Sequence, residues 1–136
     1  MNQRATGTFE VKVAPMSPDN PPAAEAALAR LSIDKRYSGA LEATGKGEML
    51  AAGGGGNKDG AYVAMERVSG SLDGRAGSFA LVHRALLRDN VPREWTVAVV
   101  PGSGTDALAG LEGALQIRIE AGQHHYDFDY TLPATP

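Results

Sequence analysis

The chain has 136 residues, of which 43% are hydrophobic and 21% are charged, so it can bury one substantial core. Its formal net charge is −3 and its basic residues are scattered along the sequence, which argues against a surface for nucleic acid. It contains no cysteine, which excludes disulfides, thiol catalysis and cysteine-based zinc sites. We therefore expect one domain over residues 1–136, with no nucleic-acid partner.

The N-terminal sequence MNQRATGTFEVKV alternates polar and apolar residues, whereas a signal peptide has a continuous apolar stretch. No segment approaches the roughly 20 apolar residues that a membrane-spanning helix needs. We expect a cytoplasmic protein that has no membrane partner.

Alternation of apolar and polar residues predicts a series of β-strands, the first over residues 8–13. The proline-rich segment 15–29 then predicts an irregular excursion with at most one helical turn. Glycines 45 and 47 suggest a bulge or bend, and the glycine-rich tract 52–60 predicts a flexible hairpin loop. The pair Asp73-Gly74 between two alternating segments is a strong hairpin signal. The remaining strands are expected at residues 31–39, 40–50, 61–72, 76–87, 95–100, 114–120 and 124–132.

The stretch PGSGT at residues 101–105 follows an apolar strand and precedes leucines at helical spacing, as a phosphate-binding loop would. A P-loop, however, needs a lysine where this sequence has Thr105 and Asp106. Gly110 and Gly113 also disfavour a following helix, by about 1 kcal/mol each relative to alanine. We interpret PGSGT as a connection between strands.

Longer stretches closely resemble the bacterial domain-of-unknown-function 3224 family, namely GTFEVK, YSGALEATGKGEML, YVAMERVSGSLDGRAGSFALVH, VVPGSGTDALAGLEGALQI and HHYDFDYTLP. The resemblance covers nearly the whole chain and implies a barrel like that of allene oxide cyclase, made of eight antiparallel strands. The glycine pattern at 104–113 is also similar to that of dirigent proteins, which share this architecture. No activity is established for the family, so the resemblance implies a fold and no reaction.

The predicted fold class is therefore all-β, a single eight-stranded antiparallel barrel. An interior of this size is filled by side chains or holds one small ligand. In the last strand, His124, Tyr126 and Tyr130 share one face with Phe128. If this face points inward, it either lines a pocket for a small apolar or aromatic ligand or forms ordinary core. Tyr62, Trp95, His124, Tyr126 and Tyr130 are the candidate ligand-binding residues.

Glu66 and His83 each interrupt an otherwise apolar strand face, which is the setting that a general acid or base requires. They are the candidate catalytic residues of an alternative function, an isomerase or cyclase acting on a small hydrophobic substrate. A structural histidine and a glutamate paired with an arginine such as Arg84 form the competing interpretation. A third alternative is a purely structural or interaction module.

The spacing His125-x-Asp127-x-Asp129 places three potential metal ligands on one strand face, but no second ligand pair accompanies it. We predict no metal and no cofactor. Strands such as WTVAVV and FALV carry apolar residues on both faces, more than one barrel interior can hide. We therefore expect a homo-oligomer, with a dimer favoured over a trimer.

Overall fold

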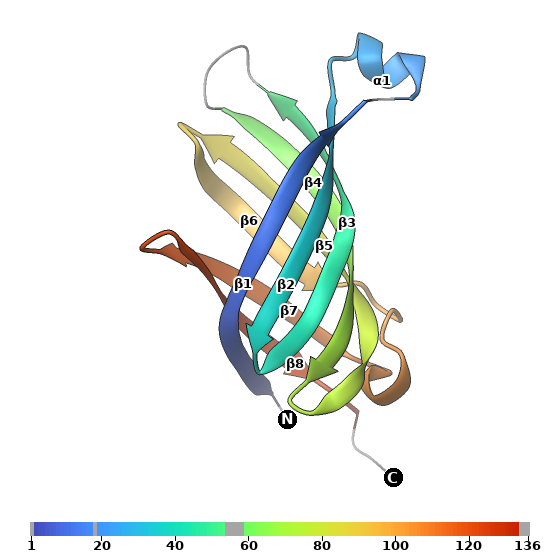
Figure 1. Cartoon of the computed structure of the whole chain (residues 1–136), viewed down its shortest axis with the longest axis vertical. Helices are drawn as coiled ribbons and strands as arrows, with labels where there is room; N and C mark the ends of the chain where they lie inside the picture. Colours follow the sequence, from blue (N-terminus) through green and yellow to red (C-terminus); the bar gives the residue numbers. More distant parts are fainter. Residues whose placement is uncertain (1, 18, 54–58, 134–136) are drawn as a thin grey trace.

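The computed structural model describes residues 2–17, 19–53 and 59–133, and its eight strands form a closed antiparallel barrel in which neighbours in sequence are neighbours in space (Figure 1). The predicted fold class is confirmed. The last strand, β8, closes the barrel by pairing with β1. The strands are β1 (Gln3–Met16), β2 (Ala29–Gly39), β3 (Leu41–Gly53), β4 (Gly60–Leu72), β5 (Arg75–Arg88), β6 (Val91–Val99), β7 (Glu112–Glu120) and β8 (Gln123–Thr131).

Among the residues that the structure describes, helical structure is confined to two short segments, α1 (Pro21–Glu25) and the 3₁₀ turn η1 (Asp106–Leu108). α1 is the single helical turn expected in the proline-rich excursion, and Asn20 caps it by accepting a hydrogen bond from the Ala23 N–H at 2.8 Å. In the part of the chain that the structure describes, no helix has the length and apolarity to cross a membrane.

Tight turns join several of the strands. Asp73 and Gly74 both have positive φ, +49° and +81°, the conformation of the hairpin turn predicted for this pair. Ala121 and Gly122 turn in the same way between β7 and β8. The glycine-rich loop predicted at 52–60 is only partly assessed, because residues 54–58 lie outside the described residues.

The bulge suggested as one alternative at Gly45 and Gly47 is wrong, because β3 keeps an unbroken register with both of its neighbours through these positions. A register shift occurs instead between β5 and β6, at Arg84 and Leu86. There Glu94, which has φ +46°, and Trp95 together oppose one residue of β5, so β6 bulges just before Trp95.

The two ends of the barrel differ. At the end that carries η1, shown at the bottom of Figure 1, a packed core fills the interior, and Leu108 of η1 is buried within it. At the opposite end, where α1 lies, two residues in phase with inward-facing neighbours are exposed: Val13 of β1 by 45% and Ile119 of β7 by 56%. The interior is therefore packed at one end and open at the other.

The barrel has one thin seam. β6 and β7 are paired in register at Ala98 and Ala114 alone, whereas seven pairs, from Gln3–Tyr130 to Phe9–His124, join β1 to β8. Above that pair the two strands diverge on the side of the open end (Figure 1).

Candidate functional site

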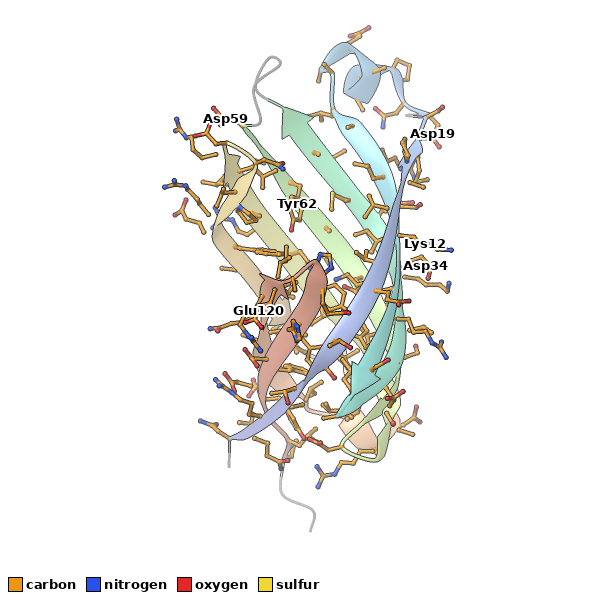
Figure 2. All side chains as sticks on the ribbon, turned by 60° about the vertical axis from the view of Figure 1, so that its left-hand side comes forward. Lys12, Asp19, Asp34, Asp59, Tyr62 and Glu120 are labelled. Atoms are coloured by element: carbon orange, nitrogen blue, oxygen red, sulfur yellow. The ribbon has the colours of Figure 1, made fainter. Side chains whose placement is uncertain are left out.

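A cavity of about 210 Å³ occupies the open half of the barrel, and all eight strands contribute to its wall. Tyr62, one of its lining residues, lies well below the rim that Asp59 marks in Figure 2. Most of the wall is apolar, and its polar exceptions are few. The lining residues are Phe9, Val11, Val13, Ile33, Lys35, Met49, Tyr62, Ala64, His83, Trp95, Ile117 and His124.

At the base of this cavity, the carboxylate of Glu66 forms a buried cluster with three other polar side chains. Glu66 Oε1 accepts hydrogen bonds from Lys35 Nζ at 3.1 Å and from His83 Nε2 at 2.8 Å. Glu66 Oε2 accepts from the Tyr37 hydroxyl at 2.6 Å. The Glu66 side chain has no exposed surface. Lys35 and His83 belong to the cavity wall, and Glu66 lies behind them. Glu66 is thus the hub of the cluster, and Lys35 and His83 are its contact with the cavity.

Two glycines of β3 make this cluster sterically feasible. In the sheet register, Gly45 faces Lys35 of β2, and Gly47 faces Glu66 of β4. With no side chains at these positions, Lys35 and Glu66 meet over the inner surface of the strand between them. A Cβ atom at residue 45 would overlap Glu66 Oε2 and lie 2.9 Å from its carboxyl carbon. Gly45 is therefore required for space rather than for an unusual backbone conformation.

The hydrogen bonds keep Glu66 ionised despite its burial. Burial alone would raise the pKa of Glu66, but the hydrogen bond from His83, the charge of Lys35 and the hydrogen bond from Tyr37 together hold it below the ordinary value. Burial and the Glu66 charge raise the pKa of Tyr37 well above its ordinary value, so Tyr37 remains a hydrogen-bond donor.

The ionised state of Glu66 fixes the tautomer of His83. A carboxylate can only accept hydrogen bonds, so the proton at the 2.8 Å contact sits on His83 Nε2. The second ring nitrogen, Nδ1, makes no hydrogen bond to any described residue and belongs to a side chain that lines the cavity. In its neutral form His83 therefore offers the cavity a lone pair.

Lys35 also has unused hydrogen-bonding capacity. Its ammonium carries three N–H donors, and it contacts two oxygens, Glu66 Oε1 at 3.1 Å and the Tyr37 hydroxyl at 3.4 Å. The ammonium lies 4.8 Å from the centre of the Phe9 ring, close enough for a cation–π interaction. One N–H donor is left for a group inside the cavity.

The aromatic wall contains another unsatisfied donor. Within the described part of the chain, the buried Nε1 of Trp95 has no hydrogen-bond partner. Burial raises the pKa of the adjacent Tyr62, and a weak interaction with the Trp95 N–H, which does not reach hydrogen-bond geometry, lowers it in part. Buried polar groups are rarely left unpaired, so this indole N–H is a second point at which a polar atom of a ligand could be held.

Comparison with known proteins assigns the chain to a family. Residues 5–130 match the family model described as "Protein of unknown function (DUF3224)". The chain belongs to the DUF3224 family. No curated protein matches it.

A solved structure from the DUF3224 family, that of a protein of unknown function from Shewanella oneidensis MR-1, is similar to this one. The two are 38% identical, and the alignment covers 98% of this chain and 100% of the other, with a TM-score of 0.87. The family resemblance noted from the sequence is therefore confirmed. The likeness to allene oxide cyclase stays a prediction.

The candidate ligand-binding residues of this DUF3224 protein fall into two groups. Tyr62, Trp95 and His124 line the cavity, and His124 packs against Phe9 with ring centres 5.0 Å apart. Tyr126 and Tyr130 also point inward but lie in the packed half, with 0% and 1% of their surfaces exposed. The inward-facing aromatic side chains of β8 therefore line the cavity at one end of the strand and form core over the rest of its length.

Hydrogen bonds explain why these two tyrosines belong to the core. The Tyr126 hydroxyl accepts from the Leu41 N–H at 2.9 Å and donates to the Ser38 carbonyl at 3.0 Å, which ties β8 to the β2–β3 turn. The Tyr130 hydroxyl donates to the Asp73 carboxylate in the β4–β5 turn. Burial and the Asp73 interaction raise the pKa of Tyr130 to about 12.

The candidate catalytic residues Glu66 and His83 do come together, but with a different partner than expected. Arg84 is exposed on the outer face, and the cation that pairs with Glu66 is Lys35. Sequence reasoning missed Lys35 and Tyr37 as members of the site. The signal was available for Lys35, since it lies in phase with Leu31, Ile33 and Tyr37 as a single charge on an apolar strand face.

The acidic residues of β8 are engaged elsewhere. Asp127 pairs with Arg118 of β7 at 2.8 Å, and Asp129 pairs with Arg4 of β1 at 2.7 Å. These are ion pairs between neighbouring strands. Among the described residues, no group of three histidine or acidic side chains is placed to hold a metal ion.

Proposed function

We propose that this protein binds one small, largely apolar molecule in the open half of its barrel. The observation that carries this proposal is the cavity of about 210 Å³, apolar over most of its wall and reached from solvent past Val13. An enclosed apolar cavity of roughly 150 Å³ is sufficient to bind benzene. The size therefore suits a molecule of one ring with small substituents, or a short-chain equivalent.

The polar groups of the wall support a ligand rather than an empty apolar space. Three polar groups of the cavity wall lack a full set of partners among the described residues, namely one N–H of Lys35, Nδ1 of His83 and Nε1 of Trp95. Ligand pockets typically combine an apolar surface with a few polar groups of this kind, which fix the ligand's orientation. A wall built only to fill space would not need them.

Trp95 provides the test, because it is the single tryptophan of the chain and lines the cavity. Toluene, titrated to its solubility limit, is expected to change the fluorescence of Trp95 in a saturable manner. Ala64→Leu, which adds volume at the cavity wall, should abolish this change. Val63→Leu is the matched control, since Val63 is adjacent in sequence but faces outward, and it should behave as wild type.

Native mass spectrometry of the freshly purified protein is the second measurement, and it is expected to detect a bound small molecule that dissociates on unfolding. The proposal fails if toluene leaves Trp95 fluorescence unchanged and the protein carries no such molecule. In that case the barrel is a structural or interaction module.

A further inference from the structure

We infer that the natural ligand is a small carbonyl compound and that His83 Nδ1 removes a proton from the carbon next to its carbonyl group. This inference rests on the proposed binding function and adds a chemistry to it. It arises from the pairing of one unused donor with one unused acceptor at the base of the same apolar cavity.

The two groups are held next to each other by a shared atom. Lys35 Nζ and His83 Nε2 both bind Glu66 Oε1, at 3.1 Å and 2.8 Å, and both side chains are almost fully buried. A carbonyl oxygen in the cavity can accept the spare Lys35 N–H. The carbon beside that carbonyl then lies near the His83 ring, on which Nδ1 is the unprotonated nitrogen.

The reaction that this pair supports is enolisation. The C–H bond breaks, the proton moves to His83 Nδ1, and the C–H electron pair becomes a carbon–carbon double bond. The carbonyl π electrons move to oxygen, where the Lys35 ammonium stabilises the enolate charge. Return of the proton to the same carbon restores the substrate, while delivery to a different atom isomerises it. No oxidant, reductant or co-reactant is needed.

Glu66 and Tyr37 are positioning residues in this scheme. Glu66 accepts a hydrogen bond from His83 Nε2 and so holds His83 in the tautomer whose Nδ1 carries the lone pair. Tyr37 donates to the other carboxylate oxygen at 2.6 Å, which fixes the orientation of Glu66. A ligand that fills the cavity displaces water from this cluster, which strengthens the Lys35–enolate interaction.

Acetophenone is a suitable probe, because it is a single-ring ketone with acidic methyl protons. We expect the wild-type protein in D₂O to accelerate exchange of those protons for deuterium, followed by proton NMR, at acetophenone concentrations that saturate the Trp95 signal. Toluene, which lacks the carbonyl, should inhibit the exchange competitively. This inhibition would locate the reaction in the cavity.

The variant His83→Gln distinguishes the role of His83 as a base from its role in stabilising the fold. The glutamine amide can still donate to Glu66 as Nε2 does, but it offers no basic nitrogen to the cavity. A general base typically contributes 10²–10⁴-fold, so exchange should fall by about 100-fold or more while acetophenone still alters Trp95 fluorescence. Arg84→Gln, which changes an exposed side chain on the outer face of the same strand, should exchange at the wild-type rate.

The outcomes separate this inference from the binding proposal. If acetophenone saturates Trp95 but its protons exchange no faster than in buffer, the reaction is overturned and ligand binding stands. If toluene binds and acetophenone does not, the carbonyl class is overturned and binding again stands. If neither probe binds, both proposals fail.

Discussion

At the scale of single residues, Glu66 supplies the negative charge that balances the buried Lys35 ammonium. Replacing it with glutamine leaves the Lys35 ammonium buried without its counter-ion. Removing one partner of a buried ion pair typically costs 3–5 kcal/mol, so we expect Glu66→Gln to lower the free energy of unfolding by about that amount at pH 7. Urea unfolding, followed by circular dichroism, measures it.

The same substitution predicts a pH dependence. The pKa of Glu66 is lowered in the folded protein, so its contribution to stability is complete above the unfolded-state pKa and is lost as the pH falls through the folded-state pKa. The stability difference between wild type and Glu66→Gln should therefore shrink below about pH 4.5, the ordinary value for a glutamate. Glu48→Gln, at an exposed ion pair with Arg30, should differ from wild type by less than about 1 kcal/mol throughout. A difference that stays constant down to acid pH would refute this account of Glu66.

The aromatic residues of the interior should respond to truncation according to which half they occupy. Tyr126→Ala removes a fully buried ring and its hydrogen bonds to β2–β3, so a loss of about 3–5 kcal/mol is expected. Tyr62→Ala only enlarges an existing cavity and should cost less, while it weakens toluene binding. Denaturant melts and Trp95 titrations of both variants test this, and equal destabilisation would contradict the division of the barrel into two halves.

At the scale of secondary structure elements, the glycines of β3 leave the space in which the side chains of Lys35 and Glu66 meet. Gly45→Ala places a methyl group where the Glu66 carboxylate lies, and overpacking of this kind typically costs 1–3 kcal/mol. Gly53→Ala is the control within the same strand, because a Cβ there meets no atom of the described residues within 4 Å. We expect the first substitution to lower the melting temperature and the second to leave it unchanged. Equal melting temperatures for Gly45→Ala and wild type would rule out the proposed steric role.

The strands themselves were predictable from the sequence, because alternation and turn residues are local signals. The Asp73-Gly74 hairpin and the short α1 were predicted for the same reason. The site was only half predictable. Lys35 and Glu66 lie 31 residues apart and meet across an intervening strand, so their pairing depends on sheet register and on the glycines at 45 and 47. The bulge before Trp95 carries no glycine and so gave no signal, since Glu94 adopts its positive φ.

At the scale of the whole molecule, the outer face of the sheet carries apolar residues that the barrel cannot bury. Leu50 pairs with Val63 and Met65 with Val82 across β3, β4 and β5, and all four are between 41% and 53% exposed. In register with Val82, Ala98 and Ala114 continue this outer apolar patch to the seam. We propose that a second copy of the chain covers it, because contiguous exposed apolar patches mark interfaces and the two-fold dimer is the commonest assembly.

Analytical ultracentrifugation at micromolar concentration is expected to show a dimer for the wild type. Met65→Lys places a charge in the centre of the patch and should shift the protein to monomer with its circular dichroism spectrum intact. Glu10→Lys, on the exposed outer face of β1, should leave the dimer unchanged. A monomeric wild type would exclude this mode of association, and a trimer would exclude the two-fold arrangement.

The weakest strand junction of the barrel, between β6 and β7, is not the junction between the first and last strands of the chain. Seven pairs join β8 to β1, so the chain's two terminal strands lie in the middle of a continuous sheet that runs from β7 through β8 and β1 to β6. Gln3 and Tyr130 already face each other in register. A circularly permuted chain, linked near those residues and opened at the exposed Gly102, would keep every strand pairing, and its termini would flank the most weakly paired junction of the closed barrel.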